Sequence, residues 1–315
     1  MSTVTSKPET TQPETATRTR TQAYVELTKT RITTMVLVTF VCAAIVASVA
    51  AGQPSVDYGK LLAGFIGMLF IACSGNAMNM YIERYTDFLM KRTASRPLPA
   101  QELTTAEVAT FGAITLGIAV AFLFGGVNWQ TGVCGVANWV LYVFIYTPLK
   151  RYTPLNTEIG AVAGAMPVIM GSLATTESVG LVGWALFGVL FLWQFPHFFA
   201  IAWMYRDQYK AGGLKMLTIT EPTGRMAGIK SVVGCIALIL VSLLPVVDLW
   251  ADVAANGWWR IILFVAVCIY IGRPYLKASF AFLKQRDDLV ARKLLRSSLL
   301  YLPLYMLVLC LVYLI

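Results

Sequence analysis

Long apolar runs separated by short polar connections dominate the pattern of this chain. Nine of these runs have close to the length of a helix that crosses a bilayer, about 20 residues. They cover residues 32–51, 59–83, 105–125, 128–148, 155–176, 179–205, 225–248, 257–276 and 294–315. The pattern therefore predicts an all-α polytopic membrane protein with about nine transmembrane helices.

The composition agrees with this prediction. Hydrophobic residues make up 57% of the 315 residues and charged residues only 13%, which is far from the balance of a soluble domain. We therefore expect the lipid bilayer to be the main surroundings of the chain.

The first 23 residues differ from the rest of the chain. They are rich in Thr, Pro, Glu and Ser and contain almost no large apolar side chains, so they cannot bury enough surface to fold alone. We expect residues 1–23 to form a disordered cytoplasmic tail and residues 24–315 to form the transmembrane domain. No cleavable signal is expected, because the apolar core does not begin until about Ile32.

The connections on the two sides of the membrane differ in charge. All 25 Lys and Arg residues except Lys60 and Arg260 lie on one side of the nine runs. The positive-inside rule then predicts a cytoplasmic N-terminus and an outer C-terminus, in a bacterial inner membrane or, in a eukaryote, in an organelle inner membrane. Because this asymmetry accounts for the net charge of +9, the charge does not argue for nucleic-acid binding.

The second apolar run ends in a polar stripe. Asn79, Glu83 and Asp87 are spaced i, i+4 and i+8, so on a continuous helix they drift only about 40° around the axis. A charge at bilayer depth costs about 2.5 to 3.5 kcal/mol on insertion scales and usually has a function. Because hard oxygen ligands are typical of Mg²⁺ and Ca²⁺ sites, we expect these three residues to bind a metal and to be catalytic.

Cations follow this stripe and occur again after the fourth run, on the same side. Arg92, Arg96 and Arg151 can hold phosphate oxygens as planar forks. Lys91 and Lys150 can do so as point charges. Mg²⁺ is usually held by one or two carboxylates together with substrate phosphates, so the combination favours an enzyme that acts on a lipid diphosphate. For Lys91 and Arg92 the alternative is an ordinary helix end at which charges reach water.

A second polar cluster lies at the end of the sixth run. His197, the only histidine of the chain, follows Trp193 and Gln194 in this cluster. A histidine near the membrane end of a polar cluster is a functional candidate, and the alternative is a hydrogen-bonded helix residue. Asp207 lies further along and is a candidate metal ligand or a plain solvated carboxylate.

These motifs together resemble a known family. The pattern Asn-x3-Glu-x3-Asp, followed by Lys91-Arg92-Thr93 and Arg96-Pro97-Leu98, is similar to the first signature of the intramembrane prenyltransferases related to the ubiquinone-pathway enzyme. Within that superfamily, residues 146–156 (Tyr-Thr-Pro-Leu-Lys-Arg-Tyr-Thr-Pro-Leu-Asn) and 193–198 (Trp-Gln-Phe-Pro-His-Phe) resemble the protohaem IX farnesyltransferases, or haem O synthases. Residues 27–33 resemble the start of their first span, and the resemblance covers about residues 24–310.

The resemblance implies a nine-helix fold around a central cavity, with the active site toward the cytoplasm. Members of that family transfer the farnesyl group of farnesyl diphosphate to the ring A vinyl group of haem B, add water and release diphosphate. The product, haem O, serves respiratory oxidases, so an association with a later haem-modifying enzyme or a terminal oxidase is a further expectation. The implied cofactor is Mg²⁺, and haem B is a substrate.

The resemblance also implies substrate-binding roles outside the stripe. Tyr146 and Asn156 belong to the second motif. His197 can serve as an axial ligand of the iron or as a partner of a propionate.

The chain departs from the family pattern at three positions. Glu83 stands where Asp is commoner, which keeps the charge and lengthens the reach, and Thr30 replaces the usual Pro. Gln208 stands where many relatives carry Asp, which weakens the case for a second Mg²⁺ there.

Two rival functions stay open on the sequence alone. One is a prenyltransferase with a quinone-precursor or chlorophyll-type acceptor, which the Trp-Gln-Phe-Pro-His segment disfavours. The other is a transporter, which would not explain a carboxylate stripe next to so many phosphate-reaching cations.

Overall fold

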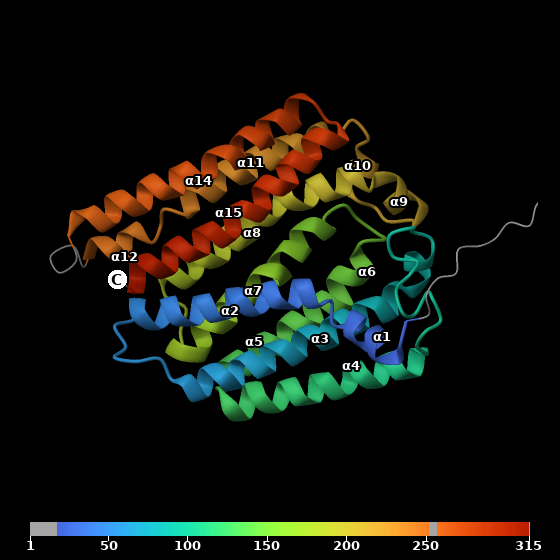
Figure 1. Ribbon diagram of the computed structural model, residues 1–315, viewed down its shortest axis with the longest axis horizontal. Coiled ribbons are helices and arrows are strands. Elements are labelled where there is room, and N and C mark those ends of the chain that lie inside the picture. The colour runs from blue at the N-terminus through green and yellow to red at the C-terminus, as the bar shows by residue number, and fades with distance from the viewer. Residues whose placement is uncertain (1–17, 252–256, 315) are drawn as a thin grey trace, which may run out of the picture.

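Nine long apolar helices run side by side in the computed structural model, which describes residues 18–251 and 257–314 (Figure 1). They are α2 (Thr30–Ala50), α3 (Tyr58–Phe88), α4 with η1 (Thr105–Gly125), α5 with η2 and α6 (Trp129–Leu149), α7 (Asn156–Thr176), α8 (Leu181–Met204), α11 with α12 (Arg225–Ala251), α14 (Trp258–Lys284) and α15 (Asp288–Leu314). The predicted all-α architecture is confirmed, and each predicted span overlaps one of these helices. The chain is a multi-pass integral membrane protein.

Several of these spans are built from shorter helical segments. Their bounds are Thr105–Val120 for α4, Ala121–Gly125 for η1, Trp129–Val140 for α5, Leu141–Tyr146 for η2, Thr147–Leu149 for α6, Arg225–Val241 for α11 and Val246–Ala251 for α12. The segments η1 and η2 are π-helical turns, a feature often found at functional sites.

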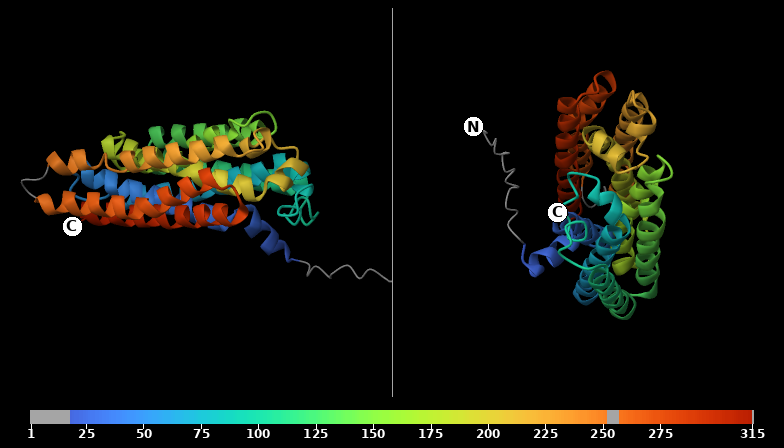
Figure 2. Two further views of the ribbon diagram at one scale, coloured as in Figure 1. Left: turned by 90° about the horizontal axis from the view of Figure 1, so that it is seen from above. Right: turned by 90° about the vertical axis from the view of Figure 1, so that its right-hand side faces the viewer.

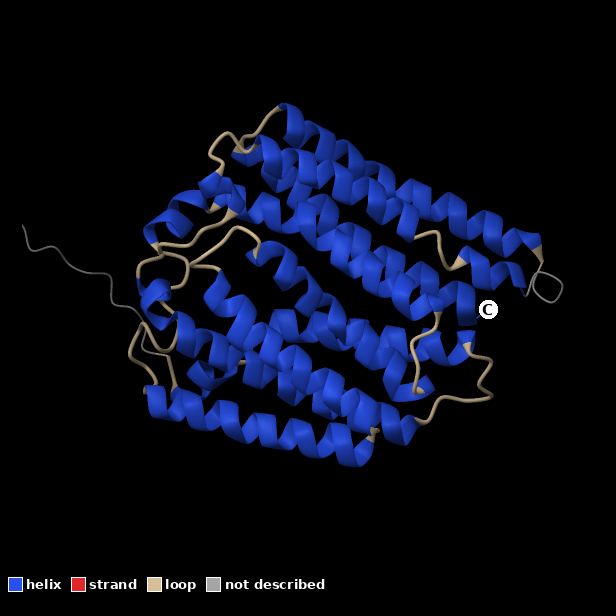
Figure 3. Ribbon diagram, turned by 180° about the vertical axis from the view of Figure 1, so that it is seen from behind, coloured by secondary structure: helices blue, strands red, loops and turns tan. Residues whose placement is uncertain are grey.

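Three short helices outside the nine spans lie at one end of the bundle, which we call the α1 end. They are α1 (Arg20–Leu27), α9 (Arg206–Ala211) and α10 (Leu217–Thr220), and the connection from α3 to α4 lies beside them (Figure 1). In the part of the chain that is described, Figure 3 shows helices and loops only, with the loops confined to the two ends of the bundle. The further views show that the axes of the long helices lie roughly along one common line (Figure 2).

Two groups of helices pack against each other. In the first group α2 packs on α7 and α3 packs on α4, and in the second α8 contacts both α11 and α15, which in turn contact α14. The contacts of α7 with α8 and of α2 with α15 join the groups. One apolar cluster, around Phe40 and Leu123, lies within the first group, and the other, around Phe264 and Tyr305, extends from the second group to α2 and α7.

Some helices extend beyond the apolar runs that predicted them. The helix α3 continues to Phe88 instead of ending near residue 83, and α15 begins at Asp288 instead of near residue 294. Hydropathy marks only the part of a helix that lies in lipid, whereas the backbone hydrogen bonds continue through the polar turns beyond it. The extra turns of α3 carry Asp87, so this difference decides the shape of the polar stripe.

The first described helix begins inside the predicted tail. Thr19 caps α1 in a capping box, because its side chain accepts a bond from the Gln22 backbone and the Gln22 side chain accepts one from the Thr19 backbone. Ala23 and Leu27 are fully buried, so residues 20–23 are helical and not part of a tail. Residues 1–17 lie outside the described part of the chain, and the tail there stays a prediction.

Small residues allow α7 to approach α2 closely. A Cβ atom added to Gly171 would lie 2.4 Å from the carbonyl oxygen of Phe40 and 3.1 Å from the Ala43 Cβ atom. Helices in membranes commonly pack through such small residues, because backbones that approach closely gain van der Waals contact.

We therefore expect Gly171→Ala to lower the stability of the protein. The added methyl group meets backbone that cannot move aside without shifting α2, and overpacking of this kind costs about 1–3 kcal/mol. The measurement is the thermal unfolding midpoint of purified protein in detergent, followed by tryptophan fluorescence.

The matched control is Gly117→Ala on α4, where an added Cβ meets nothing within 4 Å. Because Ala is a better helix former than Gly, this variant should unfold at the wild-type temperature or slightly above it. Equal midpoints for the two variants would contradict the close contact of α2 with α7.

Candidate active site

A large cavity opens between the two helix groups near the α1 end. Its volume is about 720 Å³, and α2, α3, η2, α7, α8 and α15 all contribute to its wall. Polar side chains line the part near the α1 end. Further in, the wall is mostly apolar, and on α3 it runs from Asn79 past Asn76 to Met68, a depth of about 16 Å at 1.5 Å per residue. The cavity therefore combines a charged mouth with an apolar interior.

The predicted stripe on α3 faces this cavity. Asn79, Glu83 and Asp87 all line it, with exposed fractions of 1%, 7% and 0%. Because α3 continues unbroken to Phe88, the three side chains lie on one face of the helix, as the spacing predicts. Two carboxylates buried this deeply require partners.

Each member of the stripe has a cation of its own. The Lys29 Nζ atom donates to Asn79 Oδ1 at 2.7 Å, and the Lys150 Nζ atom donates to Glu83 Oε1 at 2.7 Å. The Arg96 Nη1 atom lies 2.6 Å from Asp87 Oδ2. The cations come from three different segments, so these contacts tie three parts of the chain to α3.

Lys29 is a residue of the site that the sequence did not assign to it. It occupies the connection between α1 and α2 with φ of 47°, a left-handed conformation that is uncommon outside glycine and often marks functional sites. Burial, and then the nearby Arg96, lower the pKa of Lys29 to about 7. The sequence signal for Lys29 is a cation directly before the first span, a feature that the positive-inside rule predicts for membrane proteins in general.

Lys150 follows the π-helical segment η2 and lies over the ring of Tyr146, 4.5 Å from its centroid. Burial alone would lower the pKa of Lys150, but the Glu83 carboxylate outweighs burial and raises it. Lys150 therefore carries its charge into the cavity. Tyr146 stacks on Tyr142 with 5.5 Å between ring centroids, and both rings line the cavity.

The segment after α3 brings two arginines to the mouth of the cavity, where both contribute to its lining. The Arg92 backbone donates to Gln208 Oε1 at 2.9 Å, and the Arg92 guanidinium lies over the rings of Tyr205 and Tyr209. Gln208 therefore fixes the loop that carries Arg92 and Arg96.

Three of the predicted residues are not brought to the cavity. Lys91 is exposed and lies outside the lining. Arg151 is exposed and donates to the Thr86 hydroxyl. Asp207 is exposed on α9, because the chain turns at Tyr205 and presents Tyr209 to the cavity instead. Asp207 therefore lies outside the lining of this cavity, and its role as a metal ligand stays a prediction.

His197 lines the cavity on the side of α8 and has a fixed ring. Its Nδ1 atom lies 2.8 Å from Ser298 Oγ, and the Ser298 hydroxyl donates to the Leu295 carbonyl at 2.6 Å. The hydroxyl proton is thus used, so the network assigns Nδ1–H as the donor and leaves the lone pair on Nε2. Trp193 stacks on the His197 ring at 4.5 Å and donates to the Ser298 carbonyl.

Asn156 lines the same cavity from the start of α7. Its amide nitrogen donates to the carbonyls of Thr153 at 2.7 Å and Lys215 at 3.1 Å. Its Oδ1 atom is buried and has no partner among the described residues.

The chemistry of the stripe fits a hard divalent cation held together with a substrate. Asp87 Oδ1 is buried and has no hydrogen-bond partner in the described structure, although a buried carboxylate oxygen normally has one. Within residues 18–251 and 257–314, no three His, Cys, Asp or Glu side chains lie in an arrangement that could hold a metal ion by themselves. Two carboxylates and an amide are too few for a closed metal site but suit Mg²⁺, which usually completes its shell with substrate phosphates and water.

Comparisons with known proteins decide the family. The profile of the family described as "UbiA prenyltransferase family" matches residues 36–312. The chain belongs to the UbiA prenyltransferase family.

Named relatives narrow this assignment. A protein named "Protoheme IX farnesyltransferase" from Rhodopirellula baltica is 41% identical over 91% of this chain and 98% of its own. A mitochondrial protein of the same name from Arabidopsis thaliana is 31% identical over 90% of this chain and 63% of its own. The expected resemblance to the protohaem IX farnesyltransferases is confirmed.

Solved UbiA-type structures share the fold. A digeranylgeranylglyceryl phosphate synthase superposes with a TM-score of 0.75 at 18% identity, over 93% of this chain and 98% of that one. A UbiA homolog from Archaeoglobus fulgidus, solved with GPP and Mg²⁺, superposes with a TM-score of 0.60 at 16% identity, over 91% of this chain and 99% of that one. At these identities the likeness shows the fold alone.

The ion pair of Glu83 with Lys150 makes a testable contribution to stability. We expect Glu83→Met and Lys150→Met each to lower the free energy of unfolding by about 3–5 kcal/mol, because each leaves the other charge buried without its partner. The double variant removes both charges and should lose clearly less than the sum of the single losses. Thermal unfolding of the four proteins in detergent measures the coupling, and strictly additive losses would show that the two side chains do not interact.

Proposed function

We propose that the chain is a protohaem IX farnesyltransferase that uses farnesyl diphosphate and haem B. The curated relatives that match over most of the chain carry that name. The observation that carries the proposal is the charged mouth of the cavity, where Asn79, Glu83 and Asp87 meet three cations above a deep apolar interior. An apolar tail with a diphosphate head fits such a cavity, with the head at the mouth.

The cations of the stripe are the groups that would receive the diphosphate. Lys29, Lys150 and Arg96 already lie at hydrogen-bond distance from the stripe, and they can turn to phosphate oxygens that enter between them. The planar guanidinium of Arg96 suits a bidentate contact. Burial favours the uncharged form of Lys29, and a phosphate anion beside it would favour the charged form instead.

Asn79, Glu83 and Asp87 would hold Mg²⁺ together with the diphosphate, and the unpartnered Asp87 Oδ1 atom is the free ligand position that supports this assignment. When bound, the ion supplies positive charge to the departing diphosphate.

The residues of the cavity account for the remaining steps of the transfer. The bond between farnesyl C1 and the diphosphate oxygen breaks, and the electron pair leaves with the diphosphate, where Lys29, Lys150 and Arg96 stabilise it. The vinyl group supplies the electron pair for the new carbon–carbon bond to C1. Water then adds to the resulting cation and a proton is released, which leaves a hydroxyl group. The apolar wall protects the allylic cation from earlier attack by water.

His197 is the residue that best fits an iron porphyrin as acceptor. Because Ser298 holds Nδ1, the Nε2 atom keeps a free lone pair that it can donate to a metal. Tyr146 and Asn156 line the same cavity and are part of the proposed substrate site.

The charge asymmetry supports a cytoplasmic position for the α1 end. Lys60, at the opposite end, pairs with Glu177 at 3.0 Å, so one of the two exceptional cations is neutralised by its own carboxylate. We therefore place the active site toward the cytoplasm of an inner membrane, with the N-terminus on the same side. Association with an enzyme that consumes the product stays a prediction.

Incubation of the purified protein with haem B, farnesyl diphosphate and Mg²⁺ tests the function directly. We expect a haem of greater mass by one farnesyl group and one hydroxyl group, together with released diphosphate, and we expect EDTA to stop the reaction. An unchanged haem would contradict the proposal.

The same assay tests the stripe. Asp87→Asn should lower kcat by roughly a hundredfold or more, which is typical for the loss of one preorganised electrostatic group. Asp207→Asn should retain most of the activity, because this carboxylate is exposed outside the cavity. Comparable losses in the two variants would contradict the placement of the metal site.

Lys29→Met tests the cation that only the structure places in the site. We expect kcat/KM for farnesyl diphosphate to fall roughly tenfold to a hundredfold, the value of one hydrogen bond to a charged group. Steady-state kinetics with varied farnesyl diphosphate measure it. The control is Lys210→Met, an exposed lysine of α9; an equal effect in both variants would assign the loss to net charge.

A further inference from the structure

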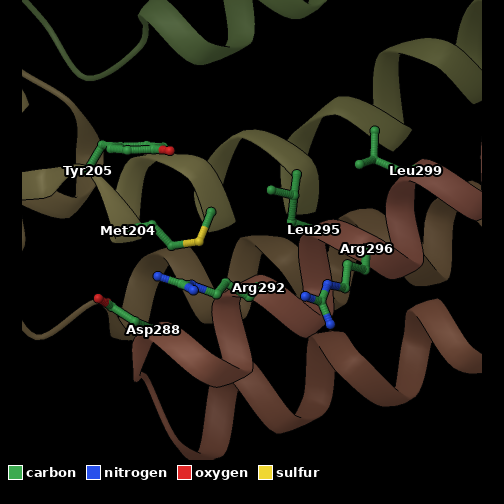
Figure 4. Close-up of a pocket in the computed structure, with 7 residues that line it drawn as sticks. All are labelled: Met204, Tyr205, Asp288, Arg292, Leu295, Arg296 and Leu299. Carbon is green, nitrogen blue, oxygen red and sulfur yellow. The ribbon is translucent and has the colours of Figure 1, made fainter. Parts of the chain in front are cut away.

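A small groove lies beside the main cavity, where the end of α8 meets the start of α15 (Figure 4). Its volume is about 240 Å³. Two arginines of α15, Arg292 and Arg296, line it together with Met204, Tyr205, Asp288, Leu295 and Leu299. No part of the donor site described above uses this groove.

The groove adjoins the main cavity, and the same two helices contribute to both. Leu299 lines both spaces. On α15, Arg292, Arg296 and Leu299 are spaced i, i+4 and i+7 and therefore share one face. On α8, His197 lines the cavity and Met204, seven residues later, lines the groove from the same face. One wall of the molecule thus leads from His197 to the arginine pair.

The two arginines differ from the three cations that hold the stripe. Lys29, Lys150 and Arg96 each hold a member of the stripe. Neither Arg292 nor Arg296 has a carboxylate within ion-pair distance among the described residues.

The one carboxylate in the groove does not form an ion pair with either arginine. Asp288 is bound at 3.0 Å by Arg206 instead. Two guanidinium groups one helical turn apart, with no acidic partner, form a site for a ligand that carries two carboxylates.

The spacing along the wall matches a flat ligand with a metal at its centre. His197 contacts Ser298 on α15, and Arg292 lies six residues from Ser298, about 9 Å along the helix axis. Ser298 is buried and lies about 200° around α15 from Arg296. A ligand whose metal lies at His197 would therefore reach the groove with one edge by passing over Leu299, which lines both spaces.

We propose that this wall is the acceptor subsite, in which Arg292 and Arg296 bind the two carboxylates of a metalloporphyrin while His197 Nε2 faces its metal. The inference rests on the proposed function and adds the orientation of the acceptor. In protohaem IX both propionates leave one edge of the ring, so their binding at the α1 end directs the vinyl group of ring A toward the apolar interior. The reacting group is then turned away from the bulk water at the mouth.

The test compares three ligands that differ in one feature each. They are haem B, its dimethyl ester, which lacks the two charges, and metal-free protoporphyrin IX, which lacks the metal. Each is titrated into purified protein in neutral-lipid nanodiscs, with Soret absorbance or porphyrin fluorescence as the readout. The variants are the double variant Arg292→Gln/Arg296→Gln, the single variant His197→Ala, and Lys293→Gln as a matched control.

The two contacts predict separate losses of selectivity. Wild-type protein should prefer haem B to its diester by roughly tenfold or more, since charge-assisted hydrogen bonds are the stronger class. The double arginine variant should bind both with equal affinity. His197→Ala should lose the preference for haem B over metal-free protoporphyrin and change the Soret spectrum. Lys293→Gln, an exposed cation of the same helix outside the groove, should keep both preferences.

Other outcomes would overturn the inference. An arginine variant that still prefers the diacid would show that the carboxylates bind elsewhere. A loss of affinity that appears only in anionic lipid, and equally for haem B and the diester, would assign the arginines to lipid headgroups. Unchanged Mg²⁺-dependent binding of farnesyl diphosphate shows that each variant is folded. If wild-type protein fails to convert haem B, the proposed function fails; if it converts haem B but the variants keep both preferences, only this inference fails.

Discussion

The whole site depends on the burial of two carboxylates and an amide near the edge of a membrane. Asp87 is fully buried and Glu83 nearly so, and removing a charge from water costs several kcal/mol unless a partner compensates it. The chain meets this constraint with one cation for each polar group of the stripe. Since these cations come from the segments before α2, after α3 and after η2, the polar contacts at the mouth also fix how those segments approach α3.

The same pairs explain how a charged mouth can exist without a ligand and still accept one. Lys150 and Arg96 are each neutralised by the carboxylate that they hold. Lys29 holds an uncharged amide and Arg92 lies over two tyrosine rings, so the ligand-free mouth keeps positive charge that attracts a diphosphate. A diphosphate brings negative charge to the cations, and Mg²⁺ brings positive charge to the carboxylates. When the diphosphate and Mg²⁺ bind together, each buried charge stays next to an opposite one. Binding therefore leaves no unpaired charge in the cavity wall.

Much of the fold can be predicted from the sequence, because the lipid around a span selects apolar residues over its whole length. Apolar runs of the right length gave all nine spans, and i, i+4 spacing placed Asn79, Glu83 and Asp87 on one face. The ends of α3 and α15 were missed, because polar turns beyond the membrane leave no trace in hydropathy. Local backbone turns decide whether the side chains of Lys29, Lys91 and Asp207 face the cavity or solvent. The left-handed conformation at Lys29 directs one cation inward, whereas the turn at Tyr205 leaves Asp207 in solvent.

The arginine pair on α15 shows a different limit of sequence reading. Cations at the cytoplasmic end of a span are what the positive-inside rule predicts, so Arg292 and Arg296 carried no special signal. Their proposed role is inferred from the helix face that they share with Leu299. It is also inferred from the contact of α15 with His197, which lies 101 residues before Ser298 in the sequence. A donor held by α3 and an acceptor held by α8 and α15 would approach the cavity from opposite walls. In that arrangement the diphosphate and the porphyrin carboxylates, which repel each other, stay on separate sets of cations.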